Sequence, residues 1–127
     1  MITKEITICG KQVTLAYCYA TEISYKILSD EEIINFSQDV IAKIQHEQMP
    51  DIRKSICLII ASMQSYYESK SEQCPITDKE LMYDCTPKEI GVALGTIIGL
   101  RGMFYHVPKN EPKDRVSDGS PVESKNS

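Results

Sequence analysis

Residues 86–106 read TPKEIGVALGTIIGLRGMFYH, and this stretch decides how the rest of the chain can be arranged. It begins as a helix, because Thr86 is a favourable N-cap, Pro87 suits the first helical position and Glu89 completes a capping box. Behind this start, side chains recur at helical spacing and define one predicted face: Ile90, Leu94, Ile97, Arg101 and Phe104. The chain is therefore expected to end its folded part in one long helix.

Glycines are concentrated in the same predicted helix. Gly91, Gly95 and Gly99 recur every four residues and Gly102 follows, so four of the six glycines of the chain lie here. Each one disfavours a helix by about 1 kcal/mol relative to alanine. Two explanations are open. Either a second backbone packs closely along the glycines, or the helix changes shape when it meets a partner, and neither explanation makes it a catalytic element.

The N-terminal residues 2–19 are predicted to form a β-hairpin. Apolar and polar side chains alternate on both sides of Gly10-Lys11, which we expect to be a two-residue turn of type II′. Ile8 then pairs with Val13, and the apolar side chains share one face. Because two strands alone are marginal in water, this face must pack on helices or on a second copy of the chain.

Further helices are expected between the hairpin and the glycine-rich helix. In order they are residues 20–28, a helix capped by Ser29-Asp30-Glu31-Glu32 that ends before Pro50, a helix capped by Asp51, and a short helix from the Thr77 capping box to about Asp84. The first should bury Ala20, Ile23 and Ile27. The helix after Asp51 has the widest apolar face, which is typical of a core helix.

The predicted fold class is α+β and mainly α-helical, with an N-terminal β-hairpin packed on four to five helices. Residues 1–106 form the predicted single domain. From Val107 onward prolines and charged residues replace apolar ones. Such a segment buries too little apolar surface to order itself, so residues 107–127 are expected to be a disordered tail.

The composition argues against nucleic-acid-binding, membrane-spanning and secreted proteins. The chain has 127 residues and a formal net charge of −4, which gives no basic surface for nucleic acid. The longest apolar run, residues 90–100, is shorter than the ~18 residues of a membrane span, and Met1 leads into a strand pattern instead of a signal peptide. Five cysteines without a CxxC pair indicate a reduced protein without a disulfide framework. We therefore expect a cytoplasmic location.

The sequence offers little for catalysis. The two histidines, His46 and His106, fall at predicted helix ends, and Cys57 lies in an apolar helix, where a thiol is usually inert. The carboxylate clusters lie at predicted helix N-termini, where capping explains them. We predict no catalytic residue, no cofactor and no metal site, and we do not expect an enzyme.

A binding role is favoured over catalysis. The residues expected to form a partner surface lie on the glycine-rich helix: Gly91, Leu94, Gly95, Ile98 and Met103. A groove beside amphipathic helices would suit a partner helix, and methionines adapt to varied apolar surfaces. The competing interpretation is that these are ordinary core and rim residues.

Three segments resemble phage tail assembly chaperones of siphophages and prophages. The segment KEITICGKQVTLAY (residues 4–17) resembles their K-x-I-T-I-x-G-K-x-V hairpin. IRKSICLIIASMQSYYES (residues 52–69) and PITDKELMYDCTPKEIGVALGTIIGLRGMFYHVP (residues 75–108) are similar to their later helices. The resemblance covers about residues 2–108. The chain departs from it in having no Trp, which we would expect near Phe104-Tyr105.

The resemblance implies a non-enzymatic role in the host cell cytoplasm. Such chaperones bind the tape measure protein, keep it soluble while tail tube protein subunits gather around it, and leave before the tail is complete. Many are also made in a longer form by −1 ribosomal frameshifting. The codons of three segments permit a slippery heptamer, and we predict that one of these sites slips: Val107-Pro108-Lys109, Pro108-Lys109-Asn110 and Ser124-Lys125-Asn126. The alternative is a small cytosolic interaction or regulatory module that forms homo-oligomers through the glycine-rich helix. Neither function needs nucleic acid or a membrane.

Overall fold

The computed structural model describes residues 1–106, which form an antiparallel hairpin and five helices. Strands β1 (Ile2–Ile8) and β2 (Lys11–Tyr17) are followed by α1 (Tyr19–Ser29), α2 (Ile33–Gln45), α3 (Ile52–Ser69), α4 (Asp78–Asp84) and α5 (Pro87–Tyr105). The predicted α+β class, mainly helical and with an N-terminal hairpin, is confirmed. The predicted disordered tail, residues 107–127, and the proposed slippery codons lie outside the described residues.

Local capping chemistry places the starts of three helices where the sequence predicts them. The Thr86 hydroxyl accepts a hydrogen bond from the Glu89 N–H at 3.2 Å, and the Glu89 carboxylate accepts one from the Thr86 N–H at 2.9 Å. Thr77 and Glu80 repeat this capping box at α4. Asp51 Oδ1 accepts from the backbone N–H at the third position of α3. Each of these bonds satisfies a donor that the first helical turn leaves free.

The predicted capping box at Ser29 is wrong. Ser29 is the last residue of α1, and its hydroxyl donates a hydrogen bond to the Tyr25 carbonyl at 2.7 Å. Asp30 then adopts a left-handed conformation with φ of 61°, which ends α1, and Glu32 is the residue before α2. Residues 29–32 therefore end α1 first, and α2 begins only after them.

The hairpin turn lies one residue earlier than predicted. Cys9 and Gly10 form the turn with φ of 52° and 74°, and a type I′ turn requires positive φ at both central residues. Ile6 consequently pairs with Val13, so the expected pairing of Ile8 with Val13 is wrong by two positions. Because the shift is even, the apolar side chains still share one face.

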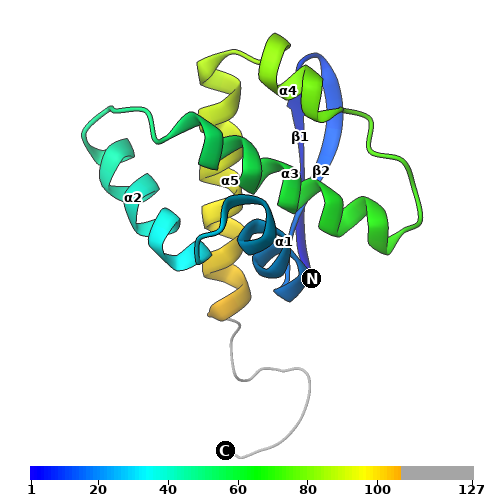
Figure 1. Cartoon of the computed structure of the whole chain (residues 1–127). Coiled ribbons are helices and arrows are strands. Elements are labelled where there is room, and N and C mark those ends of the chain that lie inside the picture. Colours follow the sequence, from blue (N-terminus) through cyan, green and yellow to red (C-terminus); the bar gives the residue numbers. More distant parts are fainter. Residues whose placement is uncertain (107–127) are drawn as a thin grey trace, which may run out of the picture.

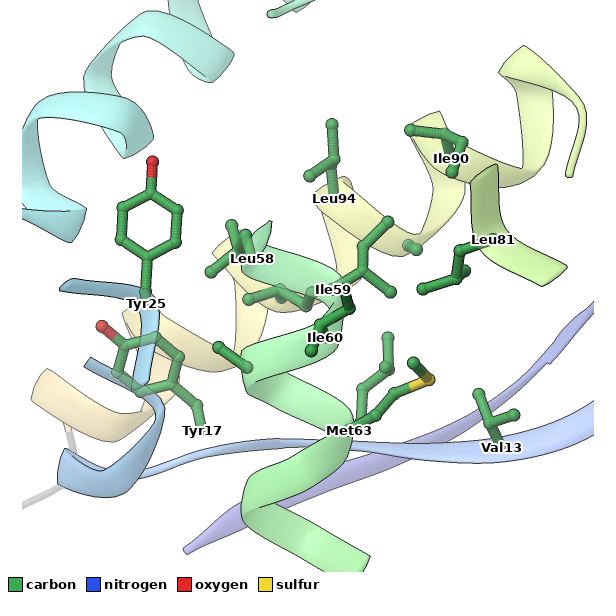
Figure 2. Packing of buried hydrophobic residues seen from close by; sticks show 14 of the residues in the cluster. Val13, Tyr17, Tyr25, Leu58, Ile59, Ile60, Met63, Leu81, Ile90 and Leu94 are labelled. Atoms are coloured by element: carbon green, nitrogen blue, oxygen red, sulfur yellow. The ribbon is translucent and has the colours of Figure 1, made fainter. Parts of the chain in front are cut away.

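Helix α3 lies at the centre of the core. It packs against β2 and α1 and also contacts α4 and α5, while α2 lies at the edge of the molecule beside α1 (Figure 1). Figure 2 shows side chains of α3 among those of the hairpin and α5, including Leu58, Ile59, Ile60, Met63, Val13, Tyr17, Ile90 and Leu94. The prediction of a core helix here is confirmed, although Ile52 at its start is 55% exposed.

Polar side chains of α3 also complete the outer edge of β2. The Ser62 hydroxyl accepts a hydrogen bond from the Ala16 N–H at 2.9 Å and donates one to the Ala16 carbonyl at 2.8 Å. One helical turn further on, the Tyr67 hydroxyl accepts from the Thr14 N–H at 2.9 Å. Buried backbone groups that lack β1 as a partner are thus satisfied by a helix.

Replacement of Ser62 by alanine is expected to lower the free energy of unfolding by about 2 kcal/mol, because the buried Ala16 N–H loses its acceptor. The Thr21 hydroxyl lies 3.2 Å from the Ala16 carbonyl and can turn its single hydrogen to that oxygen, and this limits the loss. Urea denaturation measures the difference. Ser69→Ala is the matched control, since the Ser69 hydroxyl is exposed and bonds only within its own helix. Equal stability of the two variants would contradict the role given to the edge contact.

Candidate interaction surface

The glycines of α5 lie on a side of the helix that no other part of the described chain covers. The buried side carries Ile90, Ala93, Leu94, Ile97 and Leu100. A Cβ atom built on Gly91, Gly95, Gly99 or Gly102 would meet no atom within 4 Å beyond its own helix. Close packing of a second backbone within residues 1–106 is therefore not the reason for these glycines. We call the four of them together the glycine face.

The structure separates the five residues that were predicted to meet a partner. Gly95 and Met103 are exposed, and Gly91 and Ile98 are half-buried at the surface. Leu94 is fully buried in the core, so its predicted place on a partner surface is wrong. It lies three positions from Ile97 and four from Ile90, and this spacing places all three on the core side of α5.

Helix α1 has its apolar side turned outward. Ile23 and Ile27 were expected to be buried, but they are 61% and 76% exposed, and Tyr19 on the same side is 65% exposed. The expected buried side of this helix is therefore wrong. We call these three residues, spaced by four along the helix, the α1 face.

Hydrogen bonds explain why the polar side of α1 is buried. The Thr21 hydroxyl donates to the Ser65 hydroxyl of α3 at 2.9 Å. Tyr25 is fully buried and stacks on Phe36 of α2, while its hydroxyl donates to Glu31 at 3.0 Å. Because these buried polar groups of α1 have hydrogen-bond partners, their side chains can occupy the core in place of the isoleucines.

An aromatic and acidic cluster holds the end of α5 against α1. The ring of Tyr19 meets that of Phe104 edge-on, with centroids 5.2 Å apart. The Glu22 carboxylate accepts hydrogen bonds from two hydroxyls, that of Tyr17 at 2.7 Å and that of Tyr105. The Arg101 guanidinium lies 5.1 Å from the centre of the Tyr105 ring, as in a cation–π contact. The α1 face thus adjoins the C-terminal turn of α5.

The cluster shifts the pKa values of its tyrosines. The hydrogen bond to Glu22, followed by burial and the negative charge of that carboxylate, raises the pKa of Tyr105 to about 12. For Tyr17 burial is the largest cause, and the hydrogen bond to Glu22 raises its pKa further. In both cases the neutral phenol is favoured, because ionisation would remove a donor and place a second negative charge beside Glu22.

The residues considered for catalysis lie on three different helices. His46 and His106 are the C-caps of α2 and α5, and both are exposed. Cys57 is half-buried on α3, where desolvation raises the pKa of its thiol, so the reactive thiolate is disfavoured.

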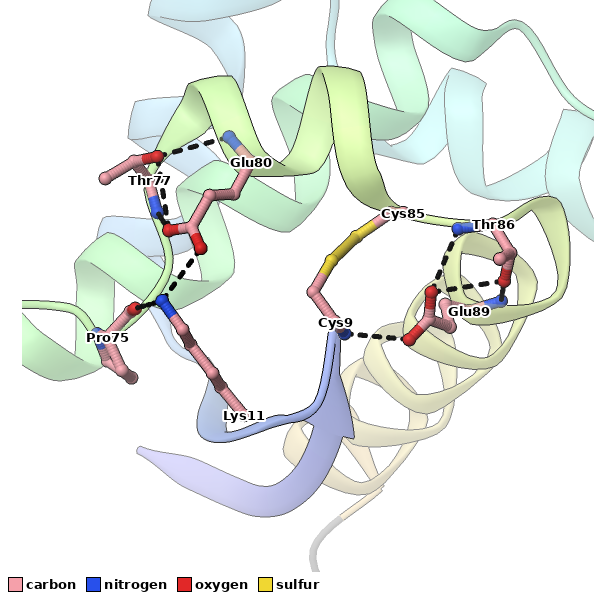
Figure 3. Close-up of a disulfide and its surroundings, with 8 residues drawn as sticks. All are labelled: Cys9, Lys11, Pro75, Thr77, Glu80, Cys85, Thr86 and Glu89. Atoms are coloured by element: carbon pink, nitrogen blue, oxygen red, sulfur yellow. Dashed lines mark hydrogen bonds and ion pairs between the residues drawn. A yellow bond between two sulfur atoms is a disulfide. The ribbon is translucent and has the colours of Figure 1, made fainter.

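The fold joins two cysteines that no motif in the sequence pairs. Cys9 in the hairpin turn and Cys85 before α5 form a disulfide, with Cα atoms 5.6 Å apart and a separation of 76 positions in sequence (Figure 3). The expectation that all cysteines stay unpaired is therefore wrong. Because the two cysteines lie far apart in sequence, they form no local motif. Only the packing of the hairpin turn on α5 shows that they pair. Closure of a loop of this length typically stabilises a fold by about 2–4 kcal/mol.

A carboxylate lies beside the disulfide. Glu89 Oε2 accepts a hydrogen bond from the Cys9 N–H at 2.7 Å, while Oε1 accepts from Thr86. The hydrogen bonds from Thr86 and then from Cys9 lower the pKa of Glu89. The two sulfur atoms and this carboxylate lie within 4.8 Å of one another, as metal ligands could. While the sulfurs are bonded to each other, however, neither is the thiolate that a metal needs.

In the described part of the chain, residues 1–106, no helix combines the length and the apolar character needed to cross a membrane. No protein-family model, curated protein or solved structure matches the chain.

The tyrosine cluster predicts a dependence of stability on alkaline pH. Folding raises the pKa of Tyr105 from 10.0 to about 12, so its stabilising contribution is complete below pH 10 and lost as the pH rises through about 12. A titration of tyrosinate absorbance should show a step near pH 12 that is missing in Tyr105→Phe. In Glu22→Gln this step should move to lower pH, whereas Glu72→Gln, an exposed control, should leave it unchanged. A step that Glu22→Gln does not move would contradict the assignment.

Proposed function

We propose that the protein is a phage tail assembly chaperone that binds the helical tape measure protein, keeps it soluble while tail tube subunits assemble, and performs no catalysis. The resemblance of the hairpin and the later helices to such chaperones supplies the class. The observation that carries the binding role is the α1 face, where three large apolar side chains are mostly exposed. Exposed apolar side chains that gather on one helix face are typical of a surface that meets a partner.

The chemistry of the α1 face suits an amphipathic helix. Its side chains, Tyr19, Ile23 and Ile27, are spaced by four and form a stripe that a partner helix can lie along. An ion pair between Lys26 and Glu32 at 3.1 Å lies at the end of this stripe and supplies a polar rim. A tape measure helix whose apolar side would otherwise aggregate is a fitting occupant.

The glycine face supports a second candidate function. Open space beyond each of its glycines allows another helix to approach the α5 backbone closely, and a second copy of the chain offers the same surface. In this alternative the protein is a small interaction or regulatory module that dimerises through α5. Sedimentation of the purified chain separates the two functions, because a tight dimer through α5 favours the module and a monomer favours the chaperone.

Ile27→Glu tests the α1 face. The charge should weaken capture of the tape measure protein at least tenfold, because the side chain is 76% exposed in the free protein and would be desolvated in the complex. Stability should change by less than about 0.5 kcal/mol, as for other exposed positions. The measurement is an affinity pull-down after co-expression from the native gene cluster, with the captured protein identified by mass spectrometry.

The matched control is Ile44→Glu, which changes an isoleucine that is 48% exposed on α2, away from the α1 face. It should retain the captured protein. If Ile27→Glu retains it equally well, the α1 face is not the binding surface. If the wild-type chain brings down no tape measure protein, the chaperone function itself is wrong.

Two substitutions of Gly95 test the glycine face. Because no atom of residues 1–106 beyond its own helix lies within 4 Å of a Cβ placed there, Gly95→Ala should raise the free energy of unfolding by about 1 kcal/mol through helix propensity. Gly95→Leu should also fold, but its side chain should block close approach of a second copy of the chain and lower self-association. Thermal unfolding and sedimentation measure the two effects. A leucine variant that keeps both stability and self-association would show that the glycine face has no part in binding.

A further inference from the structure

We propose that Cys9 and Cys85 form a reversible thiol–disulfide site that reacts with low-molecular-weight thiols, and that its reduction frees the hairpin turn from the first turn of α5. The disulfide joins the turn between β1 and β2 to the residue that precedes the N-cap of α5 (Figure 3). This inference stands on those contacts alone and does not depend on the proposed function.

The position of the site favours exchange. Both cysteines are half-buried instead of enclosed in the core, so a small thiol can reach a sulfur atom. Cys85 lies directly before the N-terminus of α5, where the helix dipole stabilises a negative charge. A thiolate stabilised in this way is a good leaving group in thiol–disulfide exchange. The Glu89 carboxylate nearby already accepts hydrogen bonds from Thr86 and Cys9, which partly balance its charge.

The backbone at Cys9 gives reduction a structural effect. Cys9 has a positive φ of 52°, a conformation that residues other than glycine and asparagine seldom adopt. Two links to α5 hold it there: the disulfide, and the hydrogen bond from the Cys9 N–H to Glu89 at 2.7 Å. When the covalent link is lost, the hydrogen bond to Glu89 is the remaining link between Cys9 and α5. The site therefore controls how firmly the turn and the start of α5 are held together.

The rest of the fold does not require the disulfide to stay in place. Lys11 forms an ion pair with Glu80 at 2.7 Å and donates a hydrogen bond to the Pro75 carbonyl at 3.2 Å, so the turn keeps a second attachment to α4 and the loop before it. Ile8 and Ile90, which flank the site in sequence, are 1% and 3% exposed and remain in the core. Reduction should consequently loosen the site without unfolding the chain.

The reaction balances with a small thiol such as glutathione as the reductant. Its thiolate attacks the Cys9 sulfur, a mixed disulfide forms, and the Cys85 thiolate leaves and takes up a proton. A second glutathione thiolate attacks the glutathione sulfur of the mixed disulfide and releases the Cys9 thiolate, which is also protonated. In total one protein disulfide and two glutathione molecules give two protein thiols and one glutathione disulfide, with two electrons passed to the protein.

The test uses the purified full-length chain in a series of reduced and oxidised glutathione mixtures. Differential alkylation followed by mass spectrometry should show Cys9 and Cys85 passing together between disulfide and thiol as the ratio changes, with Cys18, Cys57 and Cys74 as free-thiol references. Circular dichroism should stay constant across the series. In the reduced protein, hydrogen exchange should accelerate at least tenfold at residues 8–11 and 85–90 and remain unchanged in the middle of α3.

Two variants make the result decisive. Cys85→Ser should give the exchange pattern of the reduced protein at every glutathione ratio, whereas Cys57→Ser should respond as the wild type does. The proposal is overturned if the pair stays oxidised until the chain unfolds, or if both cysteines remain thiols over the whole series. It is also overturned if reduction leaves hydrogen exchange at the turn and at the start of α5 unchanged.

Discussion

The outer edge of β2 is the constraint on which the fold depends. Within residues 1–106, β2 has a neighbouring strand on one side only, and the backbone groups on its other side need partners. Two hydroxyls of α3 supply them, that of Ser62 at Ala16 and that of Tyr67 at Thr14. These bonds fix how α3 crosses the sheet. α1 is then attached to the same helix through the hydroxyls of Thr21 and Ser65, and α5 packs on the hairpin beside it.

Features set by neighbouring residues could be predicted from the sequence. The capping bonds at Asp51, Thr77 and Thr86 connect residues three apart, so the starts of α3, α4 and α5 need no tertiary information. The hairpin turn was misplaced because its conformation is set from a distance. Cys9 adopts a positive φ because it is bonded to Cys85 and Glu89, and nothing near it in sequence indicates those partners.

The candidate surface could be predicted only in part. Apolar periodicity correctly identifies the core side of α5 but gives the wrong side for α1, because hydrogen bonds to Thr21 and Tyr25 decide which side is buried. Periodicity measures apolar character and carries no information about polar partners supplied by other elements. The spacing of the α5 glycines was visible in the sequence. Only the structure shows that these glycines face open space and that Leu94 is buried.

The edge of β2 also has a consequence for the order of events during synthesis. The hydroxyls that complete this strand belong to residues 46 and 53 positions further along the chain. At a translation rate of ~5–20 residues per second, they are made roughly 2–11 seconds after the strand. A two-stranded hairpin is only marginally stable by itself, so this one has no stable partner until α3 has been synthesised. The hairpin is thus made before the helix that secures its outer edge.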